Sequence, residues 1–336
     1  MAKQRRIPTP SWERDHGIGD LSGSRGQIVA IVGVIILILA ALGVGGFALL
    51  EKYELKPRRL PGSTALAVGD HVYSVREFTN RTKMFTSQLS GTTNASIILP
   101  AVTSQLQGEA INLQFAAEKN VSASEDEIKT EIATTMSITK DDPNFDTRFQ
   151  EELTTTGLTE EQYRSFATAS VLQTKLQAAF VAALPATLES VHYRQIAVAD
   201  QATADALKDQ IEGGADFAAL AAANSTDTAT KDAGGDAGWA PRGFLNQTIE
   251  NLVFSLDINQ VVTLKSASNV TIYQLLEKDP AHAVDEAKKS TLGGNAFRDW
   301  QTEKKSGLTI DNAMDLNTGN GDRIRYVYDH AGLTAQ

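Results

Sequence analysis

An uncharged, strongly apolar run from Ile28 to Leu50 constrains this chain more than any other feature of its sequence. The run holds 23 residues. As a helix that rises about 1.5 Å per residue it would reach roughly 35 Å, enough to cross a hydrocarbon layer of about 30 Å. A cleaved secretory signal would have an apolar core of only about 7–15 residues, followed by a small-residue cleavage site. The sequence therefore predicts one N-terminal transmembrane helix.

Basic residues lie on both sides of this run, so the charge difference that the positive-inside rule uses to assign orientation is nearly zero. They are Lys3, Arg5, Arg6, Arg14 and Arg25 before it, and Lys52, Lys56, Arg58 and Arg59 after it. We expect a cytoplasmic N-terminus and an extracytoplasmic soluble part, because a long domain is translocated whatever charge lies near the span. Gly43, Gly45 and Gly46 would let two such helices approach closely, which would give a homodimer.

Charge and composition exclude several functions. The net charge of −10 argues against nucleic acid as the main partner, since phosphate binding needs a basic face. The chain has no cysteine, which excludes disulfides, thiolate chemistry and cysteine-bound metals. Its five histidines (16, 71, 192, 282 and 330) have no metal-ligand spacing, and we expect neither metal nor cofactor.

The stretch from 63 to 185 is predicted to be mostly helical. Two short strands should turn at Gly69-Asp70, before a helix that begins near Ser74. A second helix is predicted over 99–119, with Pro100 in its first turn. Capping-box spacings at Ser124 and Thr159 predict two more helix starts, and the last helix should continue to about Leu184.

After Ser190 the pattern becomes mixed. The order predicted is β-α-α-α-β-β, a compact α+β domain of about 90 residues. Its strands are 191–198, 261–265 and 270–276, its helices are 202–211, 217–223 and 247–254, and GGDAGW forms glycine turns. A further helix is expected over 282–306, followed by a strand at 323–328 and a loose polar end.

Residues 191–278 resemble the parvulin-type peptidyl-prolyl isomerases. The resemblance rests on an ordered set of segments: VHYRQIAV, DFAALAAANSTD, GGDAGW, NQTIENLVFSL and VTIYQLLEK. The flanks look like the chaperone region of the SurA, PrsA and PpiD foldases, through ALAVGDHVYSVREF, AAEKNVSASEDEI, GLTEEQYRSFATASVLQTKL and, at the C-terminal end, AFRDWQTEKKSGLTI. The resemblance covers roughly residues 63–315 and implies an extracytoplasmic location for them.

In that family the segments on either side of the parvulin module usually pack together into one chaperone domain. The resemblance thus implies an α+β protein with an N-terminal transmembrane helix, a mostly helical SurA-like domain completed by a C-terminal helix, and an inserted parvulin-like domain. The expected parts are a cytoplasmic tail (1–26), the transmembrane helix (27–50), a linker (51–62), the helical chaperone domain (63–189), the parvulin-like domain (190–279), the C-terminal helix (280–315) and a tail (316–336).

The resemblance also assigns a site. Two histidines of the parvulin core fall on Gln195 and Thr271, so both are replaced, and His192 should lie on the opposite face of the strand. A polar position that is often cysteine or aspartate matches Asp227. The proline pocket maps onto Ala237, Leu245 and Ile249, smaller side chains without an aromatic wall, and Ser266 and Ser268 would supply hydrogen bonds at its rim. The ordinary structural alternative is that Asp227 caps a turn and that Leu245 and Ile249 are helix core residues.

The sequence therefore predicts a membrane-anchored extracytoplasmic folding factor. Its partners would be unfolded or newly exported polypeptides with X–Pro bonds, and its isomerase activity would be reduced by the loss of both histidines. A non-catalytic holdase or scaffold, whose parvulin-like domain only binds peptide, is the alternative. An assembly partner for a secretion complex is a third.

Overall fold

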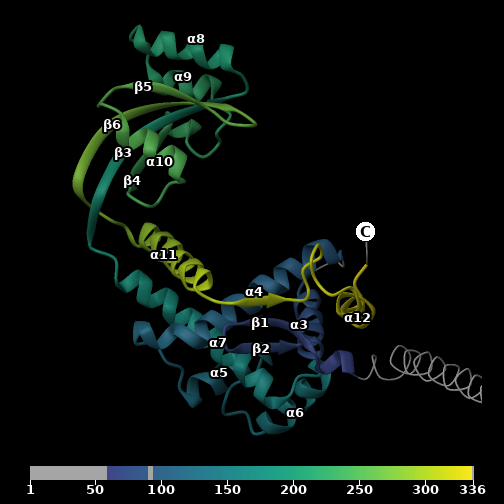
Figure 1. The fold of residues 1–336 in the computed structure, drawn as a ribbon. Coiled ribbons are helices and arrows are strands. Elements are labelled where there is room, and N and C mark those ends of the chain that lie inside the picture. Colours follow the sequence, from purple (N-terminus) through teal and green to yellow (C-terminus); the bar gives the residue numbers. More distant parts are fainter. Residues whose placement is uncertain (1–58, 90–93, 335–336) are drawn as a thin grey trace, which may run out of the picture. The chain divides into compact units, whose positions relative to one another are not determined.

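The computed structural model describes residues 59–89 and 94–334 of the chain (Figure 1). The chain divides into two compact units, residues 1–63 and 64–336, and all helices and strands labelled in Figure 1 belong to the second. The predicted transmembrane helix and most of the predicted linker lie outside the described residues. Among the residues that are described, no helix is long and apolar enough to cross a membrane.

A helical part is built around a small antiparallel sheet in the order β2-β1-β7. Its elements are β1 (Thr64–Val68), β2 (His71–Ser74), α3 (Val75–Ser87), α4 (Ala95–Phe115), α5 (Glu125–Thr135), α6 (Phe145–Thr156), α7 (Glu160–Ala182), α11 (Glu286–Ser306), β7 (Ile310–Asn312) and α12 (Gly321–Ala331). The predicted hairpin at Gly69-Asp70 and the helix that follows it are confirmed.

Side-chain caps fix the helix starts. The capping boxes at Ser124 and Thr159 are both complete, and Ser74 accepts a hydrogen bond from the backbone N–H of Glu77. The second helix begins earlier than predicted, because Asn94 caps it by accepting from Ser96. Pro100 therefore lies inside α4 rather than in its first turn, and that prediction is wrong.

The C-terminal segment completes the helical core. Phe297 and Trp300 of α11 are buried with Leu172 and Leu176 of α7 in one hydrophobic cluster. α11 packs against both α7 and α4. The ring of Phe180 lies 5.8 Å from the ring of Trp300 between centroids. Helices that are distant in sequence thus share one apolar core, and α11 buries part of the inner surface of α4 and α7.

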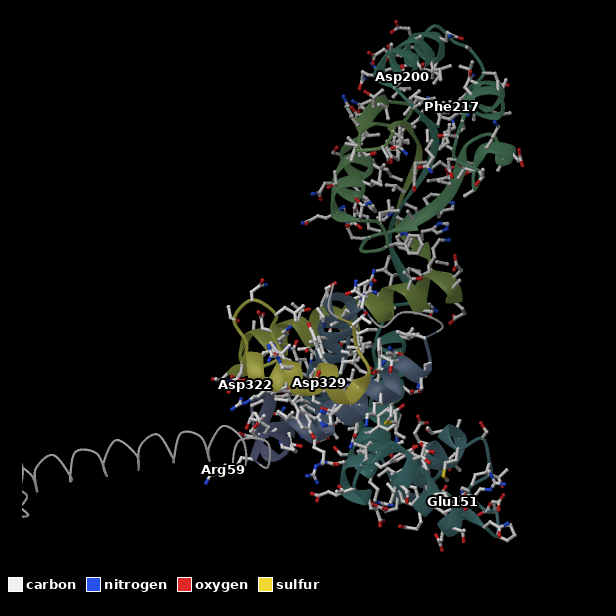
Figure 2. All side chains as sticks on the ribbon, turned by 90° about the vertical axis from the view of Figure 1, so that its right-hand side faces the viewer. Arg59, Glu151, Asp200, Phe217, Asp322 and Asp329 are labelled. Carbon is white, nitrogen blue, oxygen red and sulfur yellow. The ribbon has the colours of Figure 1, made fainter. Side chains whose placement is uncertain are left out.

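The end of the chain differs from expectation. The strand predicted at 323–328 is wrong, because these residues belong to α12, whose Val327 is fully buried against α3. Apolar residues at 324, 327 and 331 fit a helical period, which alternation over six residues concealed. Strand β7, not foreseen, pairs with β1. Figure 2 marks Asp322 and Asp329 on α12. Residues 316–334 are therefore not a loose end.

The α+β module carries a four-stranded antiparallel sheet in the order β4-β3-β6-β5. Its elements are β3 (Thr187–Val198), α8 (Gln201–Glu212), α9 (Phe217–Asn224), β4 (Asp236–Pro241), α10 (Gln247–Ser255), β5 (Val261–Lys265) and β6 (Val270–Ala283). Ile196 and Ile272 point to one face, where they pack with α8 and α9 residues such as Phe217. Tyr193 and Tyr273 belong to a second cluster that includes Val253 of α10.

Three strands of the module differ from the prediction. GGDAGW does not only turn: Gly234 and Gly235 make the turn, and strand β4 begins at Asp236. β3 and β6 also extend beyond the apolar stretches from which they were predicted. They remain paired from Val198↔Val270 out to Thr187↔Ala283. Beyond this pair, the backbone N–H of Val284 donates to the carbonyl oxygen of Ala186 at 3.1 Å.

Candidate functional site

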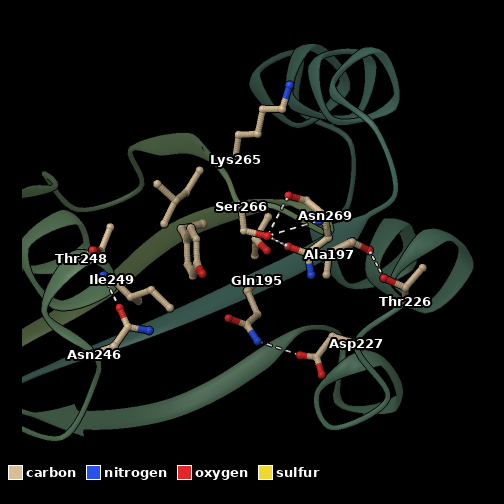
Figure 3. Close-up of a pocket in the computed structure, with 13 residues that line it drawn as sticks. Gln195, Ala197, Thr226, Asp227, Asn246, Thr248, Ile249, Lys265, Ser266 and Asn269 are labelled. Carbon is tan, nitrogen blue, oxygen red and sulfur yellow. Dashed lines mark hydrogen bonds between the residues drawn. The ribbon is translucent and has the colours of Figure 1, made fainter. Parts of the chain in front are cut away.

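A pocket of about 620 Å³ opens beside the sheet of the module (Figure 3). β3 and β6 supply its floor, β5 and the turn after it form one rim, and the start of α10 forms another. Its lining residues are Gln195, Ala197, Thr226, Asp227, Asn246, Thr248, Ile249, Leu264, Lys265, Ser266, Asn269, Thr271 and Tyr273. Residues two apart on a strand point to the same face, which is why Gln195 and Ala197, like Thr271 and Tyr273, line it together.

The loop after α9 is tied to β3. The Ser225 hydroxyl accepts hydrogen bonds from the backbone N–H groups of Ala197 and Asp227, each at 3.2 Å. The backbone N–H of Thr226 donates to the carbonyl oxygen of Ala197 at 2.8 Å. These bonds hold Asp227 over the strand, facing Gln195.

Asp227 is held as a carboxylate by its donors. Thr230 donates to Oδ2 at 2.6 Å, Gln195 Nε2 donates to Oδ2 at 2.7 Å, and the backbone N–H of Ala229 donates to Oδ1 at 3.1 Å. The Thr230 hydroxyl contributes most to lowering the pKa of Asp227, ahead of Gln195 and Ala229, while partial burial opposes them. The carboxylate is therefore ionised at neutral pH and acts as an acceptor rather than as an acid.

The glycine pair allows β4 to approach this strand. Gln195 donates its backbone N–H to the carbonyl oxygen of Gly235 at 2.8 Å. Gly235 has a φ of +82°, and a Cβ there would lie 2.5 Å from the Gln195 carbonyl oxygen. A side chain at Gly235 would thus push β4 away from the strand that carries Gln195.

An aromatic wall is present, contrary to expectation. Tyr273 lines the pocket beside Ile249 and Leu264, and its ring lies 6.1 Å from that of Tyr193. Burial is the main cause that raises the pKa of both phenols, that of Tyr193 to about 12. The phenols are therefore neutral at pH 7. With neither histidine nor cysteine among the lining residues, the pocket suits noncovalent binding of an apolar group beside fixed hydrogen-bonding groups.

Five of the eight predicted site residues line this pocket: Gln195, Asp227, Thr271, Ile249 and Ser266. The other three do not. Ala237 on β4 and Leu245 before α10 pack against the cluster around Val253, and Ser268 lies in the exposed turn between β5 and β6. Their roles in a site stay predictions, as do those of the five.

His192 lies outside the pocket. Its Nε2 is 2.7 Å from Asp236 Oδ1, and its ring stacks on Trp239 with the centroids 5.4 Å apart. Eight lining residues were not predicted from the sequence, among them Tyr273, Asn246 and Thr248. Tyr273 could have been found, because it lies two residues beyond Thr271 on the same strand.

Two family models match successive parts of the chain. A family model described as a SurA-like N-terminal domain matches residues 24–177, and one described as a PPIC-type PPIase domain matches residues 173–279. The second match contains the whole pocket.

Individual relatives match shorter stretches. Foldase protein PrsA of Caldanaerobacter subterraneus is 43% identical over 75 residues, which cover 22% of this chain and 24% of that protein. Foldase protein PrsA 3 of Bacillus anthracis is 36% identical over 97 residues, covering 28% and 34%. The matched stretches thus span about a quarter to a third of these relatives. A crystal structure of the peptidylprolyl isomerase PrsA from Bacillus anthracis aligns with 69% of this chain and 97% of its own, at 18% identity and a TM-score of 0.38.

Proposed function

We propose that this chain, in which a SurA-like N-terminal domain is followed by a PPIC-type PPIase domain, is a folding factor that holds non-native polypeptides and isomerises their X–Pro bonds. One observation carries the proposal. The pocket inside the PPIase match combines an apolar wall, made by Ile249, Leu264 and Tyr273, with the hydrogen-bonded pair of Gln195 and Asp227.

Prolyl isomerisation requires no covalent bond between the protein and its substrate. The X–Pro bond crosses a barrier of about 18–20 kcal/mol by rotation alone, and it takes tens of seconds or longer without a catalyst. A catalyst must bind the twisted amide more tightly than the planar one. An apolar pocket removes water from the carbonyl, and hydration of that carbonyl favours the planar, charge-separated form.

Gln195 supplies a polar group in the pocket that needs no proton transfer. Its Nε2 is engaged by Asp227, which fixes the amide plane and leaves the amide oxygen available as an acceptor. Thr271 adds a hydroxyl on the neighbouring strand. We assign Gln195 and Thr271 to the positions of the two histidines in the family that the sequence resembles, and on that assignment we propose an activity lower than that family's norm.

An isomerisation assay on the full-length chain tests the catalytic part. Exchange spectroscopy on a short Ala-Pro peptide should show cis–trans interconversion faster than in buffer. A rate equal to that in buffer would exclude the isomerase activity and favour the alternative, a holdase whose module only binds peptide. The holding activity is tested separately, by whether the chain suppresses aggregation of an unfolded client. Failure to suppress aggregation would exclude the chaperone function.

We also propose that the apolar run from Ile28 to Leu50 anchors the chain, with residues 64–334 on the extracytoplasmic side. The support is the length of that run and the lack of charge in it. Carbonate extraction of membranes should leave the chain in the pellet, and protease added to intact spheroplasts should digest the part after residue 59. Release of the chain by carbonate would refute the proposed membrane anchor.

A further inference from the structure

The module has two sheet edges, and they differ. β4 and β5 are the outer strands. β4 is interrupted by Gly238, with a φ of +73°, and ends in Pro241, which has no backbone N–H to offer. β5 reads VVTLK, with neither proline nor glycine, and residues of this kind favour a regular strand. Only β5 therefore presents an uninterrupted edge.

The register shows which groups of β5 face outward. In an antiparallel pair, the hydrogen-bonded residues alternate with residues whose N–H and C=O point away. Ser266 donates its backbone N–H to the Asn269 carbonyl oxygen at 2.9 Å, and Leu275 donates to that of Gln260 at 3.4 Å. The even-numbered residues of the strand therefore bond to β6.

By the same alternation, Val261, Thr263 and Lys265 direct their backbone N–H and C=O groups away from β6. Within the described part of the chain, no loop or side chain forms a hydrogen bond with these backbone groups. The edge thus has three donors and three acceptors without a hydrogen-bond partner in that part of the chain, spaced about 6.8 Å apart along the strand. Lys265 is exposed and Thr263 half-buried, whereas Val261 is buried against α8, so the edge is most open toward Lys265.

A groove of about 780 Å³ lies along this edge. Val261, Val262 and Thr263 form one side of it, and α8 forms another through Ile211 and the ion pair of Lys208 with Glu212. A backbone row of this kind is complementary to one class of ligand, an extended polypeptide, whose own N–H and C=O groups alternate with the same repeat. Such backbone pairing is largely independent of side-chain sequence, as a protein that holds many clients requires.

We propose that the edge of β5 binds an extended segment of a non-native polypeptide as an added strand. The proposal rests on the proposed function only for the nature of the occupant. It also connects the edge to the pocket, because β5 borders both: Val261–Thr263 line the groove, and Leu264 and Lys265 line the pocket. A client strand that continues past Lys265 arrives at the pocket, which raises the local concentration of X–Pro bonds there.

Amide-resolved hydrogen exchange on the full-length chain tests the added strand. The probe is a proline-free peptide of twelve residues in which valine alternates with threonine and lysine, so that a prolyl pocket is not engaged. At saturation, exchange at the N–H groups of Val261, Thr263 and Lys265 should slow at least tenfold. Val262 and Leu264, already bonded to β6, should change little. Binding without this alternation, or no binding, overturns the proposal.

A variant tests the edge independently. Thr263→Pro removes an outward N–H and adds a ring that blocks a neighbouring strand, without costing a bond to β6. It should weaken peptide binding at least tenfold, while the matched Thr263→Val binds like the wild type. Wild-type affinity in Thr263→Pro overturns the proposal; should this variant unfold, the exchange pattern of the wild type decides. Isomerisation of a four-residue prolyl peptide, too short to reach the edge, should stay within twofold. Its absence in the wild type would remove the proposed isomerase and leave the edge result standing.

Discussion

The side-chain amide of Gln195 donates a hydrogen bond of 2.7 Å to the carboxylate of Asp227, across the gap between β3 and the loop after α9. The two residues are 32 positions apart in sequence. Their contact joins the floor of the pocket to its wall. Loss of the Asp227 carboxylate would free the Gln195 amide, whereas loss of the Gln195 side chain would leave Asp227 held by Thr230 and Ala229.

Asp227→Ala should lower kcat/KM for prolyl isomerisation roughly tenfold, since it removes bonds of about 1 kcal/mol each and leaves the Gln195 amide unconstrained. Exchange spectroscopy on a prolyl peptide measures the effect. Ser255→Ala, at the exposed end of α10 and not among the residues that line the pocket, is the control and should be neutral. Equal kcat/KM in both variants would discard the pocket as the site.

The pKa of Asp227 also predicts the acid limit of this site. Because the Thr230 hydroxyl and its other donors lower this pKa below its ordinary 3.8, the carboxylate stabilises the module above that pH. The contribution is lost as pH falls through the lower folded-state value. We expect kcat/KM to be flat from pH 8 to pH 5, apart from effects on the substrate. A decline with a midpoint near pH 6 would contradict this assignment.

Glu77 predicts an opposite trend in the helical part. Burial raises the pKa of Glu77 to about 7, although Arg81 and the hydrogen bond from Gln162 oppose the shift. The folded chain then binds a proton that the unfolded chain releases near pH 4.5. Stability should therefore fall as pH rises from about 4.5 to about 7 and change little above that.

Glu77→Gln keeps the shape of the neutral acid and should remove most of this dependence. Chemical denaturation at pH 5 and pH 8 measures it: the wild type should lose on the order of 2 kcal/mol between the two, and the variant much less. Equal losses in both proteins would assign the titration to another group.

The helical caps are predictable because their signals are local. Ser124 and Thr159 each carry the partner three residues ahead, and both boxes form. Pro100 is misplaced by the sequence pattern because its fixed φ suits a first turn, whereas Asn94 provides the stronger start several residues earlier. The helix nevertheless begins at the Asn94 cap, although Pro100 in its second turn costs one hydrogen bond and crowds the carbonyl four residues before it.

Nonlocal pairing accounts for the elements that the sequence concealed. β7 has only three residues and exists because β1 offers an edge to Ile310–Asn312. The sequence of β4 suggests turns because its glycines outweigh its apolar residues, yet Gly235 is where the strand can approach Gln195. In the pocket, the resemblance located Gln195, Asp227 and Thr271, whereas Asn246 enters only through the path of the loop before α10.

Trp300→Ala should destabilise the helical part by about 3–5 kcal/mol, because the indole is 5% exposed and packs between Phe180 and Phe297. Trp300→Phe should cost less, since the indole Nε1 is buried without a hydrogen-bond partner among the described residues. Thr302→Ala, exposed on the same helix, is the control. Urea unfolding measures all three, and equal midpoints for Trp300→Ala and Thr302→Ala would refute the packing role.

Val327→Ala tests whether α12 belongs to the fold. Val327 is fully buried in the helical core, so losing two methyl groups should cost about 2 kcal/mol. Asp329→Ala, exposed two residues later, should change the free energy of unfolding by no more than about 0.5 kcal/mol. If Val327→Ala unfolded at the wild-type denaturant concentration, α12 would contribute nothing to the core.

The hydrogen bond between Val284 and Ala186 closes the base of the β3–β6 pair, so the chain enters and leaves the module at neighbouring points. The module between Ala186 and Val284 therefore connects α7 to α11 much as a tight hairpin turn would. We expect the helical part to keep its fold when Ala186 is joined to Val284 through a two-residue turn, because these two residues already lie within hydrogen-bonding distance. Gain, loss or exchange of the module during evolution need not have required changes in the helical part.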